Sequence, residues 1–277
     1  MSMEATAMTS QSSLSLPWRT RIALFVLSTV LDASYRKNGT VNRRLVNLVD
    51  YKSPPMSKAI NDVASHDVVV DEARKHRYPA QHDDSFDVLK FLDDEENRSK
   101  SLPENANLLR CFLAGDSAGG NLAHHVSQRA CEFNFRRLKI TGVLAIQPFF
   151  GGEERTDSES RLAGTPLLSI KNTDWMWNAI LPQCEGFNRD HPIINVSGPN
   201  AVDISEIESP PIMVVVGGFD VLLDWQKRYY EWLKKSGKEV YLLEFPNMCH
   251  AFYLFPELPE SAQLIEQVRD FIHKGIE

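Results

Sequence analysis

The sequence has few cysteines, and none are paired at the spacing of a metal or redox site. Its four cysteines, Cys111, Cys131, Cys184 and Cys249, stand far apart, and no CxxC pair occurs. This pattern is typical of free thiols in a reducing compartment and argues against a disulfide scaffold. No histidine has the spacing of a zinc ligand. We therefore expect neither a structural metal nor another cofactor.

Long apolar runs are also missing. No stretch approaches the ~18 apolar residues that a membrane-spanning helix requires. Residues 22–27 follow two arginines, as the apolar part of a signal peptide would, but polar Ser28 and Asp32 interrupt the run. We therefore expect no membrane association and a cytoplasmic protein, or one that is cytoplasmic and nuclear.

A positively charged patch is absent as well. The formal net charge is −7, and the basic residues are scattered along the chain. Because nucleic-acid binding needs clustered Lys and Arg, this argues against nucleic acid as a partner. Internal repeats and low-complexity tracts do not occur. With 277 residues, 43% of them hydrophobic, the chain suits one large α/β domain with a substantial core.

Beyond residue 110, apolar runs of strand length alternate with segments of helical spacing. The runs predict strands at 111–114, 142–146, 212–216 and 240–245. The helical spacing predicts helices at 118–131, 224–235 and 261–273. Strands that are apolar on both faces and separated by helices indicate a mostly parallel sheet that helices cover on two sides.

The remaining segments are less regular. Residues 1–15 are rich in Ser and Met without a period, which predicts a disordered leader. Helical spacing predicts helices at 18–35 and 85–93, and a β-branched run predicts a short strand at 67–71. The stretch 151–200 interrupts the strand–helix alternation, as an inserted helical cap would.

The segment Gly115-Asp116-Ser117-Ala118-Gly119 fits the nucleophile elbow G-x-S-x-G. Small flanking residues permit a strained strand-to-helix turn that exposes the serine hydroxyl. Here the motif follows a predicted strand and precedes a predicted helix, which is the context that the chemistry demands. A glycine-rich turn without chemistry is the alternative.

A serine hydroxyl becomes a good nucleophile only when an imidazole removes its proton and a carboxylate holds that imidazole. Asp220 follows the predicted strand 212–216, and His250 follows the last predicted strand, in the chain order Ser, Asp, His. The alternatives are a surface carboxylate and a loop histidine.

Three other residues compete for these roles. Asp224 begins a predicted helix, so we expect it to cap that helix. His124 and His125 lie inside a predicted helix, where histidines are more often surface or packing residues. We therefore favour Asp220 and His250 as the partners of Ser117.

Several segments together resemble plant carboxylesterases of the hormone-sensitive-lipase group, the α/β-hydrolase fold-3 family that includes relatives of the gibberellin receptor. The resemblance covers nearly everything after residue 17. Its most specific segments are residues 76–80, 115–125, 147–152, 189–192, 217–220 and 249–252.

The resemblance implies an α/β-hydrolase domain over residues 16–277, with a helical cap at about 151–200 and an N-terminal lid helix. It implies hydrolysis of carboxylic esters through an acyl-enzyme, with Ser117, Asp220 and His250 as the triad and the backbone N–H of Ala118 as an oxyanion donor. The receptor branch loses the triad histidine and the dehydratase branch can replace the serine by threonine. This chain keeps both residues, which favours the esterase.

One departure from the family is large. The family carries a His-Gly-Gly oxyanion loop between two segments that here adjoin: Asp71–Arg74 runs through Lys75 straight into His76. An internal deletion explains this, and it predicts a sheet that is incomplete at its N-terminal part and impaired activity. The alternatives to a carboxylesterase are a non-catalytic, receptor-like protein that binds a small apolar ligand, and a nonfunctional truncated product. The expected partner is thus a small-molecule ester or a small apolar ligand, and the sequence leaves the oligomeric state open.

Overall fold

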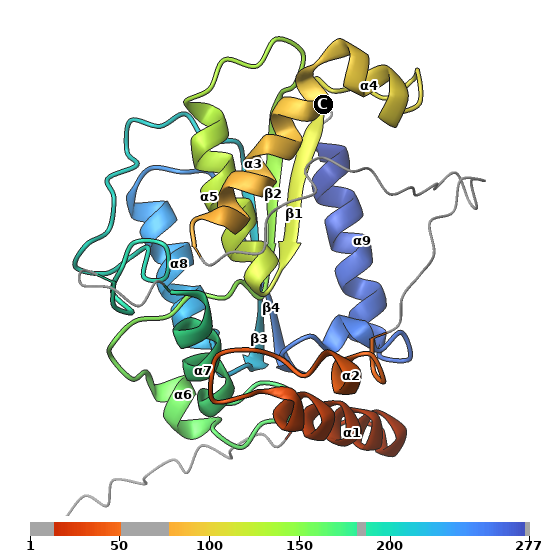
Figure 1. Ribbon diagram of the computed structural model, residues 1–277, viewed down its shortest axis with the longest axis vertical. Helices are drawn as coiled ribbons and strands as arrows, with labels where there is room; N and C mark the ends of the chain where they lie inside the picture. Colours follow the sequence, from red (N-terminus) through yellow and green to blue (C-terminus); the bar gives the residue numbers. More distant parts are fainter. Residues whose placement is uncertain (1–13, 51–77, 182–186, 275–277) are drawn as a thin grey trace, which may run out of the picture.

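Four parallel strands form a sheet at the centre of the computed structural model, which describes residues 14–50, 78–181 and 187–274 (Figure 1). The strands are β1 (Cys111–Asp116), β2 (Ile140–Ile146), β3 (Ile212–Phe219) and β4 (Val240–Cys249), in the order β1-β2-β3-β4. Val214 and Val215 of β3 are fully buried, because helices cover both faces of the sheet.

The helices lie in two layers. The larger layer packs on one face and contains α3 (Ala80–Asp93), α5 (Ala118–Cys131) and α8 (Leu223–Lys235). The opposite face is covered by α9 (Pro259–Lys274), whose Phe271 contacts Phe112 of β1. The short α4 (Glu95–Ser101) follows α3. These helices and strands confirm the predicted alternation, although α3 begins five residues before the predicted helix. The predicted strand at 67–71 and most of the predicted leader lie outside the described residues.

The first strand, β1, lies at one edge of the described sheet. Its side chains are half-buried or exposed, whereas those of β3 are nearly all buried. In the described part of the chain, β2 is the only strand that pairs with β1. The missing oxyanion segment predicts a sheet that is incomplete at its N-terminal part, and the described strands agree with this prediction.

The N-terminal helix α1 (Trp18–Ser34) lies at the end of the sheet where the strands terminate, beside α7 (Ile170–Ile180) (Figure 1). The Ser28 hydroxyl accepts a hydrogen bond from the backbone N–H of Leu167 at 2.8 Å, and Asp32 accepts one from the Asn172 side chain at 2.8 Å. A one-turn helix, α2 (Arg43–Val46), follows α1. Within the described ranges, no helix is both long and apolar enough to cross a membrane.

The segment 151–200 contains α7 and the short α6 (Asp157–Arg161). The Glu159 carboxylate, 1% exposed, accepts hydrogen bonds from the backbone N–H of Thr156 at 2.9 Å and from the indole of Trp225 at 3.3 Å. It also pairs with Arg155 at 3.2 Å. Because Trp225 belongs to α8, this buried carboxylate joins the segment to the core.

Asp224 does not cap α8, so that expectation was wrong. The helix begins one residue earlier, at Leu223, and Asp224 lies within its first turn. Its carboxylate instead accepts a 2.7 Å hydrogen bond from the backbone N–H of Ser158, in the first turn of α6. A negative charge is favourable at that position, because the first N–H groups of a helix lack partners within the helix. In the folded protein, the Asp224 side chain therefore binds the first turn of α6 instead of its own helix, α8.

We predict that Glu159→Ala lowers the free energy of unfolding by about 3 kcal/mol, because it leaves buried donors of Thr156 and Trp225 without an acceptor. Urea denaturation followed by far-UV circular dichroism measures this. Asp157→Ala is the matched control, since Asp157 lies in the same helix with its side chain 83% exposed; we expect it to change stability by less than about 0.5 kcal/mol. Equal stability of the two variants would contradict the role of Glu159.

Candidate active site

The turn between β1 and α5 presents Ser117 in a strained conformation. Its φ and ψ are 51° and −115°, and a positive φ is uncommon for a residue other than glycine. Neighbouring glycines make the turn possible. A Cβ atom at Gly115 would lie 2.1 Å from the carbonyl oxygen of Gly119, and one at Gly120 would lie 2.9 Å from the Cβ of Pro148. The local sequence thus forms the sharp turn that the G-x-S-x-G pattern predicts.

The structure brings Ser117, His250 and Asp220 together, although 133 residues separate the first two. The Nε2 atom of His250 lies 3.0 Å from Oγ of Ser117, and its Nδ1 lies 2.7 Å from Oδ2 of Asp220. His250 is 6% exposed and Asp220 is completely buried. The imidazole therefore lies within hydrogen-bond distance of both the hydroxyl and the carboxylate.

Two further donors hold the buried Asp220 carboxylate. The backbone N–H of Leu222 donates to Oδ1 at 3.0 Å, and the side-chain amide of Gln226 donates to Oδ2 at 2.9 Å. Both carboxylate oxygens thus accept hydrogen bonds, and a carboxylate that accepts at both oxygens has no proton to donate to Nδ1 of His250. The Nδ1 of His250 must then carry the proton, which leaves Nε2 with a lone pair toward the Ser117 hydroxyl. The sequence showed no sign of Gln226, because one buried amide in a helix has no recognisable pattern.

The opening residue of α5, Ala118, follows the serine directly. The first N–H groups of a helix have no acceptor within the helix, so the N–H of Ala118 is a suitable donor for a developing oxyanion. Ala118 also lines a narrow cavity of about 70 Å³ beside the elbow. The cavity is mostly apolar, and its other lining residues include Leu122, Phe149, Trp177, Ile180 and Ile193.

Tyr253 also contacts the elbow, from the 3₁₀ turn η1 (Phe252–Leu254). Its hydroxyl donates a 2.8 Å hydrogen bond to Oδ2 of Asp116, the residue before the serine. Burial, followed by the nearby negative charge of Asp116, raises the pKa of Tyr253, so the hydroxyl stays protonated as a donor. Sequence analysis missed this contact, because 137 residues separate the two side chains.

The competing histidines on α5 are packing residues. His124 is buried, and its Nδ1 lies 3.0 Å from the hydroxyl of Tyr229. Burial lowers the pKa of His124 to about 3, so it is neutral at physiological pH. The Nε2 of His125 lies 3.2 Å from the carbonyl oxygen of Ile193. Packing, rather than surface exposure, is therefore the correct interpretation for this pair.

Cys249 stands directly before His250 but is buried. Burial raises the pKa of its thiol to about 11, so the thiol is un-ionised at neutral pH. Within the described ranges, no group of three or more His, Cys, Asp or Glu side chains is arranged to hold a metal ion. Ser117 is thus the nucleophile candidate that the geometry favours.

A parallel sheet with helices on both faces and a serine elbow after a strand defines an α/β hydrolase. The chain belongs to the family described as the alpha/beta hydrolase fold, because residues 68–254 match its family model. This confirms the predicted fold class.

Gibberellin receptors and carboxylesterases of plants are among the proteins that this chain resembles. A gibberellin receptor of Arabidopsis thaliana, GID1C, is 39% identical over 202 residues, which cover 73% of this chain and 56% of the receptor. The 3-O-acetylpapaveroxine carboxylesterase CXE1 of Papaver somniferum is 33% identical over 210 residues, which cover 72% of this chain and 64% of the enzyme. The predicted resemblance to plant carboxylesterases and gibberellin-receptor relatives is confirmed. The chain spans between about half and two thirds of the length of these relatives.

Solved structures of esterases share the fold. A fungal esterase from Rhizomucor miehei superimposes with a TM-score of 0.62 at 24% identity, covering 72% of this chain and 59% of that one. The esterase from Pyrobaculum calidifontis gives a TM-score of 0.60 at 23% identity, covering 71% of this chain and 61% of that one. At this level of identity the likeness concerns the fold alone.

We predict that Gly115→Ala prevents the elbow from forming, because the added methyl group meets the backbone of Gly119. The expected loss is about 3 kcal/mol or more of unfolding free energy. Gly164→Ala is the control, since a Cβ atom there meets nothing within 4 Å. Chemical denaturation of both variants measures the difference, and a Gly115→Ala chain as stable as the control would disprove the steric argument.

Proposed function

We propose that this chain is a carboxylic ester hydrolase that uses Ser117 as nucleophile, His250 as general base and acid, and Asp220 to orient the histidine. The observation that carries the proposal is the hydrogen-bonded row of these three side chains, with separations of 3.0 Å and 2.7 Å. Two of its members are almost completely buried, which protects the row from competing water. Several of the relatives are carboxylesterases, which agrees with this chemistry.

The geometry supports a two-step reaction. His250 takes the hydroxyl proton while Oγ of Ser117 attacks the ester carbonyl carbon, and the N–H of Ala118 donates to the resulting oxyanion. The imidazolium then gives its proton to the departing alcohol, leaving an acyl-enzyme. Water, deprotonated by His250, then attacks the acyl carbon, and the imidazolium returns its proton to Oγ of Ser117 as the carboxylic acid leaves. Asp220 orients the imidazole through Nδ1 and stabilises the imidazolium.

The oxyanion donors limit the rate that we expect. The sequence lacks the His-Gly-Gly loop from which the family draws further donors, so Ala118 supplies the N–H nearest to the nucleophile. Losing one oxyanion donor lowers kcat of a serine hydrolase by about 10² to 10³. We therefore propose slow, serine-dependent turnover of small esters.

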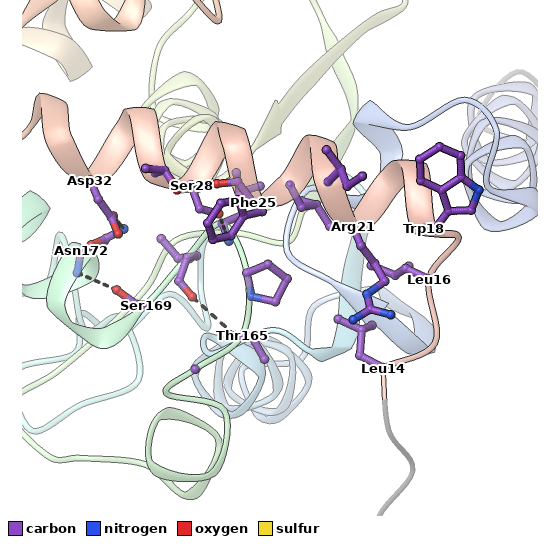
Figure 2. Close-up of a pocket in the computed structure, with 17 residues that line it drawn as sticks. Leu14, Leu16, Trp18, Arg21, Phe25, Ser28, Asp32, Thr165, Ser169 and Asn172 are labelled. Carbon is purple, nitrogen blue, oxygen red and sulfur yellow. Dashed lines mark hydrogen bonds between the residues drawn. The ribbon is translucent and has the colours of Figure 1, made fainter.

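A second candidate function, binding of a small apolar ligand, is favoured by a separate pocket of about 740 Å³ between α1 and residues 164–172 (Figure 2). Its lining contains none of the three residues in the hydrogen-bonded row. Figure 2 shows Trp18, Phe25 and Leu16 along one side, with Arg21 and Asp32 as the charged residues. Some relatives are gibberellin receptors, so a gibberellin is a suitable first test ligand for this chain.

We predict that the purified chain hydrolyses p-nitrophenyl acetate slowly and that Ser117→Ala abolishes this activity, because no other side chain replaces the nucleophile. Release of p-nitrophenol, measured by absorbance, tests this. Circular dichroism of both chains serves as the control for folding. Equal rates in two folded chains would refute the hydrolase proposal.

We predict for the second function that a ligand at 100 times its Kd raises the free energy of unfolding by about 2.7 kcal/mol, and therefore raises the Tm. Thermal unfolding with and without gibberellin measures the shift. Ser117→Ala should shift equally, whereas Gly164→Trp, which fills the pocket from a position with free space, should not. An unchanged Tm in all three chains would argue against gibberellin as the ligand.

A further inference from the structure

The carboxyl ends of three strands each supply one residue of the hydrogen-bonded row. Ser117 follows β1, Asp220 follows β3 and His250 follows β4. The residue after β2 is Gln147, whose side chain is completely buried at the same end of the sheet. The proposed reaction gives it no role, although a buried amide is expected to have a structural or functional reason.

The side-chain amide of Gln147 binds the backbone on both sides of His250. Its Nε2 donates to the carbonyl oxygen of Cys249 at 3.1 Å, and its Oε1 accepts from the backbone N–H of Ala251 at 2.6 Å. One planar group therefore fixes the residue before the histidine and the residue after it. Ala251 has a φ of 57°, so this second bond stabilises an unfavourable backbone conformation.

The turn that contains Gln147 also binds the backbone of the nucleophile. The N–H of Ser117 donates to the carbonyl oxygen of Ile146 at 2.9 Å, and the N–H of Phe149 donates to the carbonyl oxygen of Ser117 at 2.8 Å. Because β1 and β4 lie at opposite edges of the described sheet, no ladder hydrogen bond joins Ser117 to His250. The turn after β2 bridges them, with two bonds on each side.

The conformation of Gln147 is itself strained, with a φ of 43°. Such a conformation persists only where its surroundings enforce it. The backbone N–H of Gln147 donates to the carbonyl oxygen of Val215 in β3 at 2.8 Å. This bond connects the turn to the centre of the sheet. The space around the amide is also restricted, since a Cβ atom at Gly217 would lie 2.5 Å from Nε2 of Gln147.

We propose that Gln147 is a positioning residue that sets the distance between Oγ of Ser117 and Nε2 of His250 by holding both backbones through a single turn. The inference rests on the proposed hydrolase function and deepens it. Gln147 touches neither reacting atom, so it acts through the histidine and the serine. A small displacement of a general base is sufficient to slow the chemical step while substrate binding is unchanged.

The first test is Gln147→Met, which removes both hydrogen bonds and nearly preserves the side-chain volume. We expect kcat for p-nitrophenyl acetate to fall by about tenfold to hundredfold, with KM within about twofold of the unaltered chain. Asn195→Ala is the matched control, because Asn195 is also a buried amide but bonds to Asp190, away from the row. We expect kcat of the control to stay within about twofold.

A second readout does not need turnover. In chain labelled with ¹⁵N-histidine, the ring resonances of His250, assigned by comparison with His250→Ala, report its bond to Asp220. We expect Gln147→Met to shift these resonances and to speed hydrogen exchange at the Ala251 amide, and Asn195→Ala to do neither. A general loss of stability would not change the His250 ring resonances and the Ala251 exchange rate selectively.

Gln147→Glu tests the two bonds separately. A protonated carboxyl group donates to Cys249 and accepts from Ala251, as the amide does, whereas an ionised one only accepts. Relative to the unaltered chain at the same pH, the variant should therefore keep most of the activity while the new carboxyl group is protonated and lose it as the pH rises through the pKa of that group. The unaltered chain should show no such loss over the same range. If Gln147→Met fails to fold, this pH profile and the His250 resonances of Gln147→Glu decide the matter.

The outcomes separate the two proposals. An unaltered chain without Ser117-dependent turnover contradicts the hydrolase function, and the His250 resonances still decide the role of Gln147. A folded Gln147→Met chain with unchanged kcat, unchanged His250 resonances and unchanged Ala251 exchange overturns the inference. Reduced kcat at constant KM, together with shifted His250 resonances, supports it.

Discussion

The parallel pairing of four strands is the constraint on which the site depends. The register aligns β1 with β2, β2 with β3 and β3 with β4 over their apolar residues, so all four strands end on the same side of the sheet. The loops that follow them therefore meet, although they lie far apart along the chain. Ser117, Gln147, Asp220 and His250 come from these four loops, one from each. A polar cluster at this end of an open α/β sheet is where such folds place their functional groups.

Backbone strain concentrates at the same end of the sheet. Ser117, Gln147 and Ala251 all have positive φ values, between 43° and 57°. A non-glycine residue held in this region costs energy of order 1–3 kcal/mol. Backbone hydrogen bonds hold Ser117 and Gln147 in these conformations, and the buried amide of Gln147 holds Ala251. The gain is a serine hydroxyl that projects from a sharp turn toward a fixed imidazole.

The structure contains two regions of different physical character, and each supports a different function. The row of Ser117, His250 and Asp220 is buried, hydrogen-bonded and suited to proton transfer. The pocket beside α1 is separate from that row, is larger than the cavity at the elbow and has a mixed apolar and polar lining, which suits the binding of a small molecule. The relatives include both carboxylesterases and gibberellin receptors, so the names of the relatives agree with either function. The sequence lacks the His-Gly-Gly loop, so the proposed oxyanion donor nearest to the nucleophile is the backbone N–H of Ala118.

Local patterns in the sequence determined which residues form strands and helices, because apolar periodicity and glycine placement act over a few neighbours. They also determined the elbow at Ser117, where Gly115 is required by its close contact with Gly119, four residues along the chain. Chain order suggested Asp220 and His250 as partners. Only the tertiary structure decided that Asp224 binds α6, that His124 is buried, and that Gln147, Gln226 and Tyr253 contact the site. Each of these side chains contacts a residue that no sequence pattern links to it, in most cases on another helix or strand. Hydrogen bonds of this kind produce no periodic pattern that a single sequence could reveal.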